Sequence, residues 1–143
     1  MKFTSAIALL AAFASPALAT LVNVTYDQTY DNPSTSLAST ACSNGVNGLE
    51  TKGYTTLGSL PSFPYIGGIP GLTWNSTLCG TCWKLAYDPA NGTAASINIL
   101  AVDAAFTYNI ALEAMNNLTS GQAVALGKVQ ATATQVDASV CGL

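Results

Sequence analysis

Strand-like patterns of apolar and polar residues recur along this chain. Val22–Tyr26 alternates apolar and polar side chains, as a strand with one buried face does. Trp83–Tyr87 and the apolar run Ser96–Val102 (SINILAV) are strong strand candidates, and Gly127–Val136 alternates again over its whole length. These four segments predict a domain that is mostly β.

One segment has a helical period. Asn109–Leu118 places five apolar side chains on one face of a helix, namely Ile110, Ala111, Ala114, Met115 and Leu118. Asn109 is a suitable N-cap and Glu113 lies near the positive end of the helix dipole. We therefore predict one firm helix here, closed by Gly121, and a shorter helix over Ser36–Cys42.

Glycine, proline and asparagine mark the connections. Thr55–Leu60 is predicted as a short strand stopped by prolines, and Phe63–Gly71 as a Pro- and Gly-rich loop packed on the domain. Asp88–Gly92 contains Asn-Gly, which tolerates positive φ, and predicts a hairpin loop between two strands. A mostly β chain with one firm helix indicates a small barrel or sandwich.

The first 19 residues have the features of a secretory signal peptide. Lys2 precedes the short apolar core Ala6–Phe13, and Ala17-Leu18-Ala19 offers small residues for cleavage. The core is too short to span a bilayer. We therefore expect residues 1–19 to be removed, residues 20–143 to form a single domain, and the product to be secreted and extracellular, for example in a cell wall.

Charge limits the kinds of partner. Residues 20–143 carry three lysines, seven carboxylates and no arginine, a net charge of −4. Nucleic acids and anionic membranes require a basic face, so we expect neither as a partner. Few charges among many Ser, Thr, Asn and Gly side chains suit a neutral polysaccharide.

Four cysteines in a secreted chain favour two structural disulfides. Cys79-x-x-Cys82 also resembles a redox or metal motif, but the chain has no His and no second closely spaced cysteine pair. We expect no metal site and no cofactor. Four sequons are candidate N-glycan sites, of which we expect one or two to be occupied: Asn23, Asn75, Asn91 and Asn117.

The absence of histidine excludes Ser-His-Asp triads and Cys-His dyads. A glycosidase would instead need two carboxylates flanking one bond, and Asp103 with Asp31, Asp27 or Glu50 are the candidates. Asp103 is notable because it ends an apolar strand where a surface loop should begin. Either it serves a ligand there, or it only binds nearby backbone amides.

Saccharide binding needs aromatic platforms and hydrogen-bonding groups. Five aromatic residues lie in or beside predicted loops, although a single residue of this kind is more often only half-buried packing: Tyr26, Tyr30, Tyr65, Trp74 and Tyr108. Trp83, inside a strand, is expected in the core. Ser43, Asn44 and Asn109 are polar candidates, and Asn109 is alternatively only a helix cap.

Six segments and the C-terminal CGL carry a family resemblance: VTYDQTYD (24–31), ACSNGVNGLE (41–50), FPYIGG (63–68), WNSTLCGTCWKLAY (74–87), ILAVDAAFTYNIALEAMNNLTSGQAVALG (99–127) and VQATATQV (129–136). Taken together, they resemble the cerato-platanin family of small secreted fungal proteins. The resemblance implies a six-stranded double-psi β-barrel similar to an expansin domain. It also implies the disulfides Cys42–Cys79 and Cys82–Cys141.

The family implies binding of chitin oligomers, loosening of cellulose or chitin, and elicitation of plant defence. The matching Asp103 would lie in a carbohydrate groove, with Asn109, Ser43, Asn44, Tyr30 and Tyr108 as further site candidates. Expansins carry a His-containing triplet near their Asp, and no His exists here to supply it, which argues for binding rather than hydrolysis.

Three hypotheses follow from the sequence. The first is a non-catalytic, monomeric cell-wall protein that binds chitin or N-acetylglucosamine oligomers or β-glucan, with a host receptor as a further candidate partner. The second is a glycoside hydrolase on the same barrel. The third is a surface-active coat protein, suggested by the apolar fraction of 50%, which the signal peptide inflates.

Overall fold

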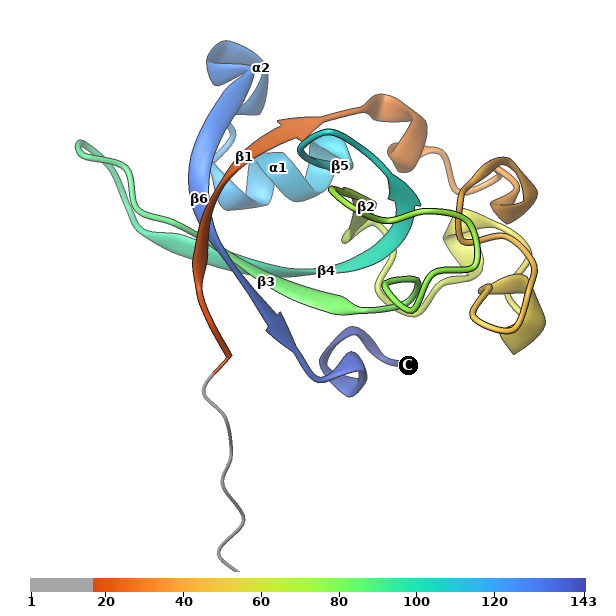
Figure 1. Ribbon diagram of the computed structural model, residues 1–143. Coiled ribbons are helices and arrows are strands. Elements are labelled where there is room, and N and C mark those ends of the chain that lie inside the picture. The colour runs from red at the N-terminus through yellow and green to blue at the C-terminus, as the bar shows by residue number, and fades with distance from the viewer. Residues whose placement is uncertain (1–16) are drawn as a thin grey trace, which may run out of the picture.

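A computed structural model describes residues 17–143 of the chain (Figure 1). The predicted signal peptide, residues 1–19, lies outside the described residues except for its last three. No helix within residues 17–143 is long and apolar enough to cross a membrane.

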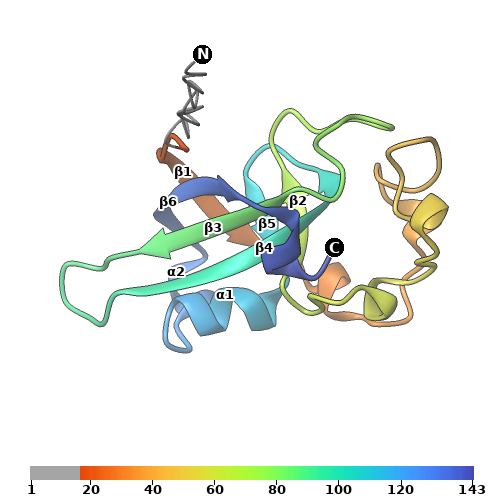
Figure 2. The same ribbon diagram turned by 90° about the horizontal axis from the view of Figure 1, so that it is seen from below.

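Six strands close into one barrel (Figures 1 and 2). Their bounds are β1 Thr20–Tyr26, β2 Ile66–Ile69, β3 Cys82–Tyr87, β4 Ala95–Ala104, β5 Tyr108–Ile110 and β6 Lys128–Val136. The order around the barrel is β1-β5-β2-β4-β3-β6. The pairs β1·β5 and β2·β4 are parallel and the other four pairs are antiparallel. The implied six-stranded double-psi barrel is therefore confirmed.

The four strands predicted from the pattern of apolar and polar residues are present as β1, β3, β4 and β6. β3 and β4 pair antiparallel up to Tyr87 and Ala95, so the predicted hairpin at Asp88–Gly92 is confirmed. The expected positive φ is absent, however, because neither Asn91 nor Gly92 adopts it. The connection between Tyr87 and Ala95 is longer than a two-residue turn, so the chain can reverse direction there without a positive φ.

Two predictions on the first half of the chain are wrong. Thr55–Leu60 is not a strand: Leu57–Ser59 forms a 3-10 helix, and only Thr56 makes an isolated bridge, to Ser36. Phe63–Gly71 is not all loop, because Ile66–Ile69 forms β2 between β5 and β4. The prolines flank that strand and leave its own backbone free to pair.

The predicted helix is shorter than expected at its N-terminal end. α1 spans Leu112–Leu118, and Asn109 belongs to β5. The prediction that Asn109 caps the helix is wrong, since Ala111 is the N-cap residue and its side chain makes no cap bond. A second short helix, α2, spans Ala123–Leu126. Five 3-10 helices complete the described elements: Gln28–Asp31, Leu37–Ser39, Glu50–Lys52, Leu57–Ser59 and Ala138–Cys141.

The core fills the barrel and continues under its loops. Val24, Leu85, Ile99 and Ile110 are fully buried in the strands, and Met115 of α1 packs with them. The segment between β1 and β2 lies at one end of the barrel, and the β3–β4 hairpin extends at the opposite end (Figures 1 and 2).

Two disulfides join these parts. Cys42 is bonded to Cys79, and Cys82 is bonded to Cys141, which confirms the pairing that the family resemblance implied. The structure therefore ties the loops between β1 and β2, and the C-terminal residues, to the short segment from Cys79 to Cys82, where β3 begins.

Candidate functional site

Asp103, near the end of β4, binds the loop that follows β1. Its Oδ1 accepts hydrogen bonds from the backbone N–H of Ala41 at 2.8 Å and of Ala104 at 2.9 Å. Its Oδ2 accepts a bond from the hydroxyl of Tyr30 at 3.2 Å. Asp103 thus has the scaffold role that the sequence left open as an alternative, and its half-exposed side chain still borders a hollow.

That hollow, which we call the Asp103 pocket, has a volume of about 110 Å³. Polar side chains dominate its lining: Asp27, Thr29, Tyr30, Thr35, Ser39, Thr40 and Asp103, with Leu57 as the apolar exception. Burial, together with the Asp103 carboxylate that accepts its hydrogen bond, raises the pKa of Tyr30 well above its usual range. Tyr30 therefore stays a neutral donor at ordinary pH.

Asn109 lies in the same cross-strand row as Asp103 without sharing its pocket. Gly68 of β2 is in register with Asp103 on one side and with Asn109 on the other. A Cβ on Gly68 would meet Ala105 Cβ at 2.8 Å and the Tyr30 hydroxyl at 3.1 Å, so these groups fill the space over Gly68, and Asn109 does not line the Asp103 pocket. The Asn109 Oδ1 accepts instead from the Thr25 hydroxyl at 2.8 Å.

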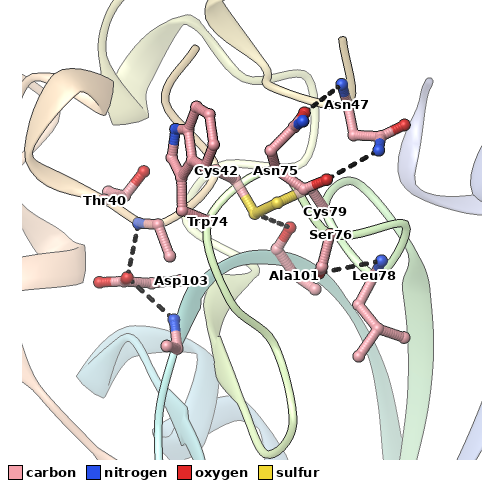
Figure 3. Close-up of a disulfide and its surroundings, with 12 residues drawn as sticks. Thr40, Cys42, Asn47, Trp74, Asn75, Ser76, Leu78, Cys79, Ala101 and Asp103 are labelled. Carbon is pink, nitrogen blue, oxygen red and sulfur yellow. Dashed lines mark hydrogen bonds between the residues drawn. A yellow bond between two sulfur atoms is a disulfide. The ribbon is translucent and has the colours of Figure 1, made fainter. Parts of the chain in front are cut away.

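Asn44 forms a hydrogen bond with Trp74, one of the aromatic residues considered for sugar binding. Its Oδ1 accepts a hydrogen bond from the Trp74 indole N–H at 2.7 Å, and 61% of Trp74 is exposed. Figure 3 shows Trp74 and Asp103 in the surroundings of the Cys42–Cys79 disulfide. Ser43 is buried, and its carbonyl accepts from the Glu50 backbone N–H.

Tyr108 is in a different environment from the one expected. It begins β5 and is buried, with its ring edge-on to Trp83 at a centroid distance of 5.7 Å. Burial raises the pKa of Tyr108 to about 12. Tyr108 thus has the packing role that the sequence left open as the alternative to a binding role, because the segment that it begins is a strand and not a loop.

Phe106 is a surface aromatic residue that sequence reasoning missed. It is fully exposed in the connection between β4 and β5, three residues after Asp103. A bulky apolar side chain in a short loop directly after the candidate carboxylate was the available signal. With Trp74, in the loop between β2 and β3, it makes two exposed aromatic rings on the loops of the described residues.

Two of the other three carboxylates proposed for hydrolysis also bind backbone N–H groups. Asp27 accepts from Thr29, and both oxygens of Asp31 accept from the first turn of α1. With Asp103, three of the four candidate carboxylates hold local structure. In addition, no cluster of three or more His, Cys, Asp or Glu side chains suited to a metal ion is found among residues 17–143.

Known proteins resemble this chain over nearly its whole length. The Cerato-platanin family model matches residues 22–143. "Allergen Asp f 15" of Aspergillus fumigatus is 47% identical, over 99% of this chain and 97% of that protein. "Heat-stable 19 kDa antigen" of Coccidioides immitis is 40% identical, over 100% and 99% of the two chains.

Solved structures agree with the sequence comparison. The crystal structure of cerato-platanin 1 from M. perniciosa has a TM-score of 0.81 and 43% identity, and covers 84% of this chain and 98% of that one. The solution structure described as that of "the fungal elicitor Cerato-Platanin" has a TM-score of 0.70 and 40% identity, and covers 84% and 96% of the two chains.

Proposed function

The chain belongs to the cerato-platanin family, and from this premise we propose that it is a secreted, non-catalytic protein of the fungal cell wall that binds neutral polysaccharide. The ligands are chitin or N-acetylglucosamine oligomers, or β-glucan. By competing for contacts between polysaccharide chains it loosens their packing, as expansins do, and a plant host receptor recognises its stable surface as an elicitor.

The observation that carries this proposal is the chemistry around Asp103. The pocket of about 110 Å³ has room for a substituent of one sugar ring, and its hydroxyl groups and carboxylates match sugar hydroxyl and amide groups. Trp74 and Phe106 offer exposed rings for the C–H faces of further sugar units. The pocket contains no cationic group, which suits an uncharged ligand.

Binding is favoured over hydrolysis because the carboxylates are engaged. A glycosidase needs one carboxylic acid to donate a proton and one carboxylate to activate water or attack the sugar. Here Asp27, Asp31 and Asp103 accept hydrogen bonds from backbone N–H groups, and Asp31 and Asp103 do so while holding separate segments together. The family is also not one known for enzymes.

A titration with oligosaccharides tests the proposal. Amide NMR shifts are followed while the N-acetylglucosamine tetramer, a laminari-oligomer or a cello-oligomer is added to residues 20–143. Asp103→Asn keeps the side-chain shape and removes a charge-assisted contact of about 1.5–3 kcal/mol, so binding should weaken about tenfold or more. Asp88→Asn, an exposed acid in the β3–β4 hairpin, is the matched control and should bind like the wild type.

Two results would overturn the proposal. Wild-type protein that binds none of the three oligomers is not a polysaccharide-binding protein of this kind. If the protein releases reducing ends from chitin or glucan over time, and Asp103→Asn abolishes this release, the glycoside hydrolase hypothesis replaces the binding hypothesis.

A further inference from the structure

A second and larger hollow, which we call the C-terminal groove, lies along the first half of β4. Its volume is about 630 Å³, and its walls are the segment 61–65, the strand positions 96–98 and the C-terminal residues 139–142. None of its lining residues lines the Asp103 pocket. Asn98 precedes Asp103 by five residues in β4, about 16 Å at the rise of a strand. The two hollows are therefore separate.

The lining of the C-terminal groove combines aromatic and neutral polar groups. Phe63 and Tyr65 are half-buried, and Ser96, Asn98 and Ser139 are exposed. No lining residue is charged, so an ionic ligand would find no counter-charge. Aromatic rings beside hydroxyl and amide groups are the features that sugar rings require, one for their C–H faces and the other for their hydroxyls.

One polar atom at this groove lacks a partner. The Oγ of Ser62 is buried without a hydrogen bond to any residue that the structure describes. Ser62 is itself part of the groove lining. Because this oxygen is itself buried, a ligand in the groove would pair with it only after a rotation of the Ser62 side chain.

The walls of the groove are held in place by the rest of the domain before any ligand arrives. The Tyr65 hydroxyl accepts a hydrogen bond at 2.7 Å from the Asn117 side-chain amide of α1. Cys141 is bonded to Cys82 of β3. A Cβ on Gly142 would meet the Pro61 Cβ at 2.8 Å, which means that the two opposite walls are in close contact there. A preformed site loses less conformational entropy when it binds.

From these observations we infer that the C-terminal groove is a second saccharide-binding site, which takes an uncharged oligosaccharide across Phe63 and Tyr65. This inference rests on the proposed function, since both sites serve neutral polysaccharide. Two separate sites on one barrel allow the protein to contact two polysaccharide chains, or two places on one chain, and so gain avidity.

The test uses a variant confined to exposed polar groups. Asn98→Ala with Ser139→Ala removes an amide and a hydroxyl from the groove, while the hydrogen bond from the Ser139 backbone N–H to the Asp137 carboxylate remains. Gln130→Ala with Ser34→Ala removes the same kinds of group from exposed positions elsewhere and is the control. With the N-acetylglucosamine tetramer as probe, amide shifts in wild-type protein should appear at 61–65, 96–98 and 138–142. In the groove variant that site should bind about tenfold more weakly.

The outcomes separate the two proposals. Groove shifts that persist in Asp103→Asn and weaken in the groove variant support a second, independent site. Shifts confined to the Asp103 pocket, with the groove variant equal to wild type, overturn the second site and leave the proposed function standing. No saccharide binding in wild-type protein overturns both. If the groove binds a proline-rich peptide but does not bind the N-acetylglucosamine tetramer, the inference is also overturned.

Discussion

Asp31 caps helix α1 at Leu112, 81 residues further along the chain. Its Oδ2 accepts a hydrogen bond from the Leu112 N–H at 2.8 Å, and its Oδ1 accepts one from the Glu113 N–H at 2.9 Å. The helix has seven residues and receives no cap from its own N-cap residue. A helix this short is marginal alone, so a carboxylate at its positive end is a tertiary contribution to its stability.

Removing this cap should weaken the whole domain. Asp31→Ala leaves two N–H groups of α1 without their acceptor, and we expect the free energy of unfolding to fall by about 1–2 kcal/mol. Urea denaturation measures the change, with Asp88→Ala in the exposed hairpin as control. Equal urea midpoints for the two variants would show that the cap contributes nothing.

Asp103 should contribute to stability as well as to binding. Asp103→Ala leaves the Ala41 N–H, the Ala104 N–H and the Tyr30 hydroxyl without their acceptor, and we expect a loss of about 1–3 kcal/mol. Asp103→Asn keeps one oxygen for the two N–H groups and should lose less. Thermal or urea unfolding compares the two variants, and an alanine variant as stable as the asparagine variant would contradict this ranking.

The fold should lose stability in alkali. Burial raises the pKa of Tyr108 to about 12, and burial followed by the Asp103 carboxylate raises that of Tyr30. Because the unfolded chain releases these protons near pH 10, their contribution is complete below that pH and is lost as pH rises toward the folded pKa values. Ultraviolet absorbance of tyrosinate should show Tyr30 and Tyr108 titrating late.

Tyr30→Phe is the specific check on the alkaline prediction. The variant removes one of the two late-titrating groups, so its stability should fall less steeply above pH 10 than that of the wild type. If all six tyrosines of the wild type titrate together near their usual pKa, then the buried environment described for Tyr30 and Tyr108 is absent in solution.

Both disulfides should be structural. They join cysteines separated by 37 and 59 residues, and the chain-entropy model assigns each about 4 kcal/mol. Thiol titration of native protein should find no free cysteine, and reduction should lower the urea midpoint more than acidification to pH 4 does. If the disulfide of Cys79 or of Cys82 is readily reduced, the redox interpretation of the Cys79-x-x-Cys82 motif would again apply.

The strands with alternating side chains were predictable because one buried face leaves a local pattern. β2 was not, since Ile-Gly-Gly-Ile carries no alternation. Its glycines are required by neighbours distant in sequence: a Cβ on Gly67 would meet the Asn109 carbonyl oxygen at 2.5 Å. Likewise, the start of α1 depends on Asp31 and not on a residue beside it.

The candidate site was predictable to a similar extent. The position of Asp103 at the end of an apolar run is visible in the sequence, and so is the suitability of a carboxylate for either role. Its partners Ala41 and Tyr30 come from a different segment, and nothing local pairs them with it. Tyr108 was misplaced because a strand of three residues is too short to show a period.

The two disulfides also determine what a protease can do to this molecule. A single cut between Cys42 and Cys79, or between Cys82 and Cys141, leaves the two pieces covalently joined. Between Cys42 and Cys141, only a cut between Cys79 and Cys82 separates them. That short segment is paired with β4, since Gly80 N–H donates to the Ala101 carbonyl and Ala101 N–H donates to the Thr81 carbonyl, both at 2.9 Å. Within Cys42–Cys141, the one stretch where a nick would divide the chain is thus hydrogen-bonded to β4, and a molecule nicked elsewhere in that range can keep its surface, and any epitope on it, intact.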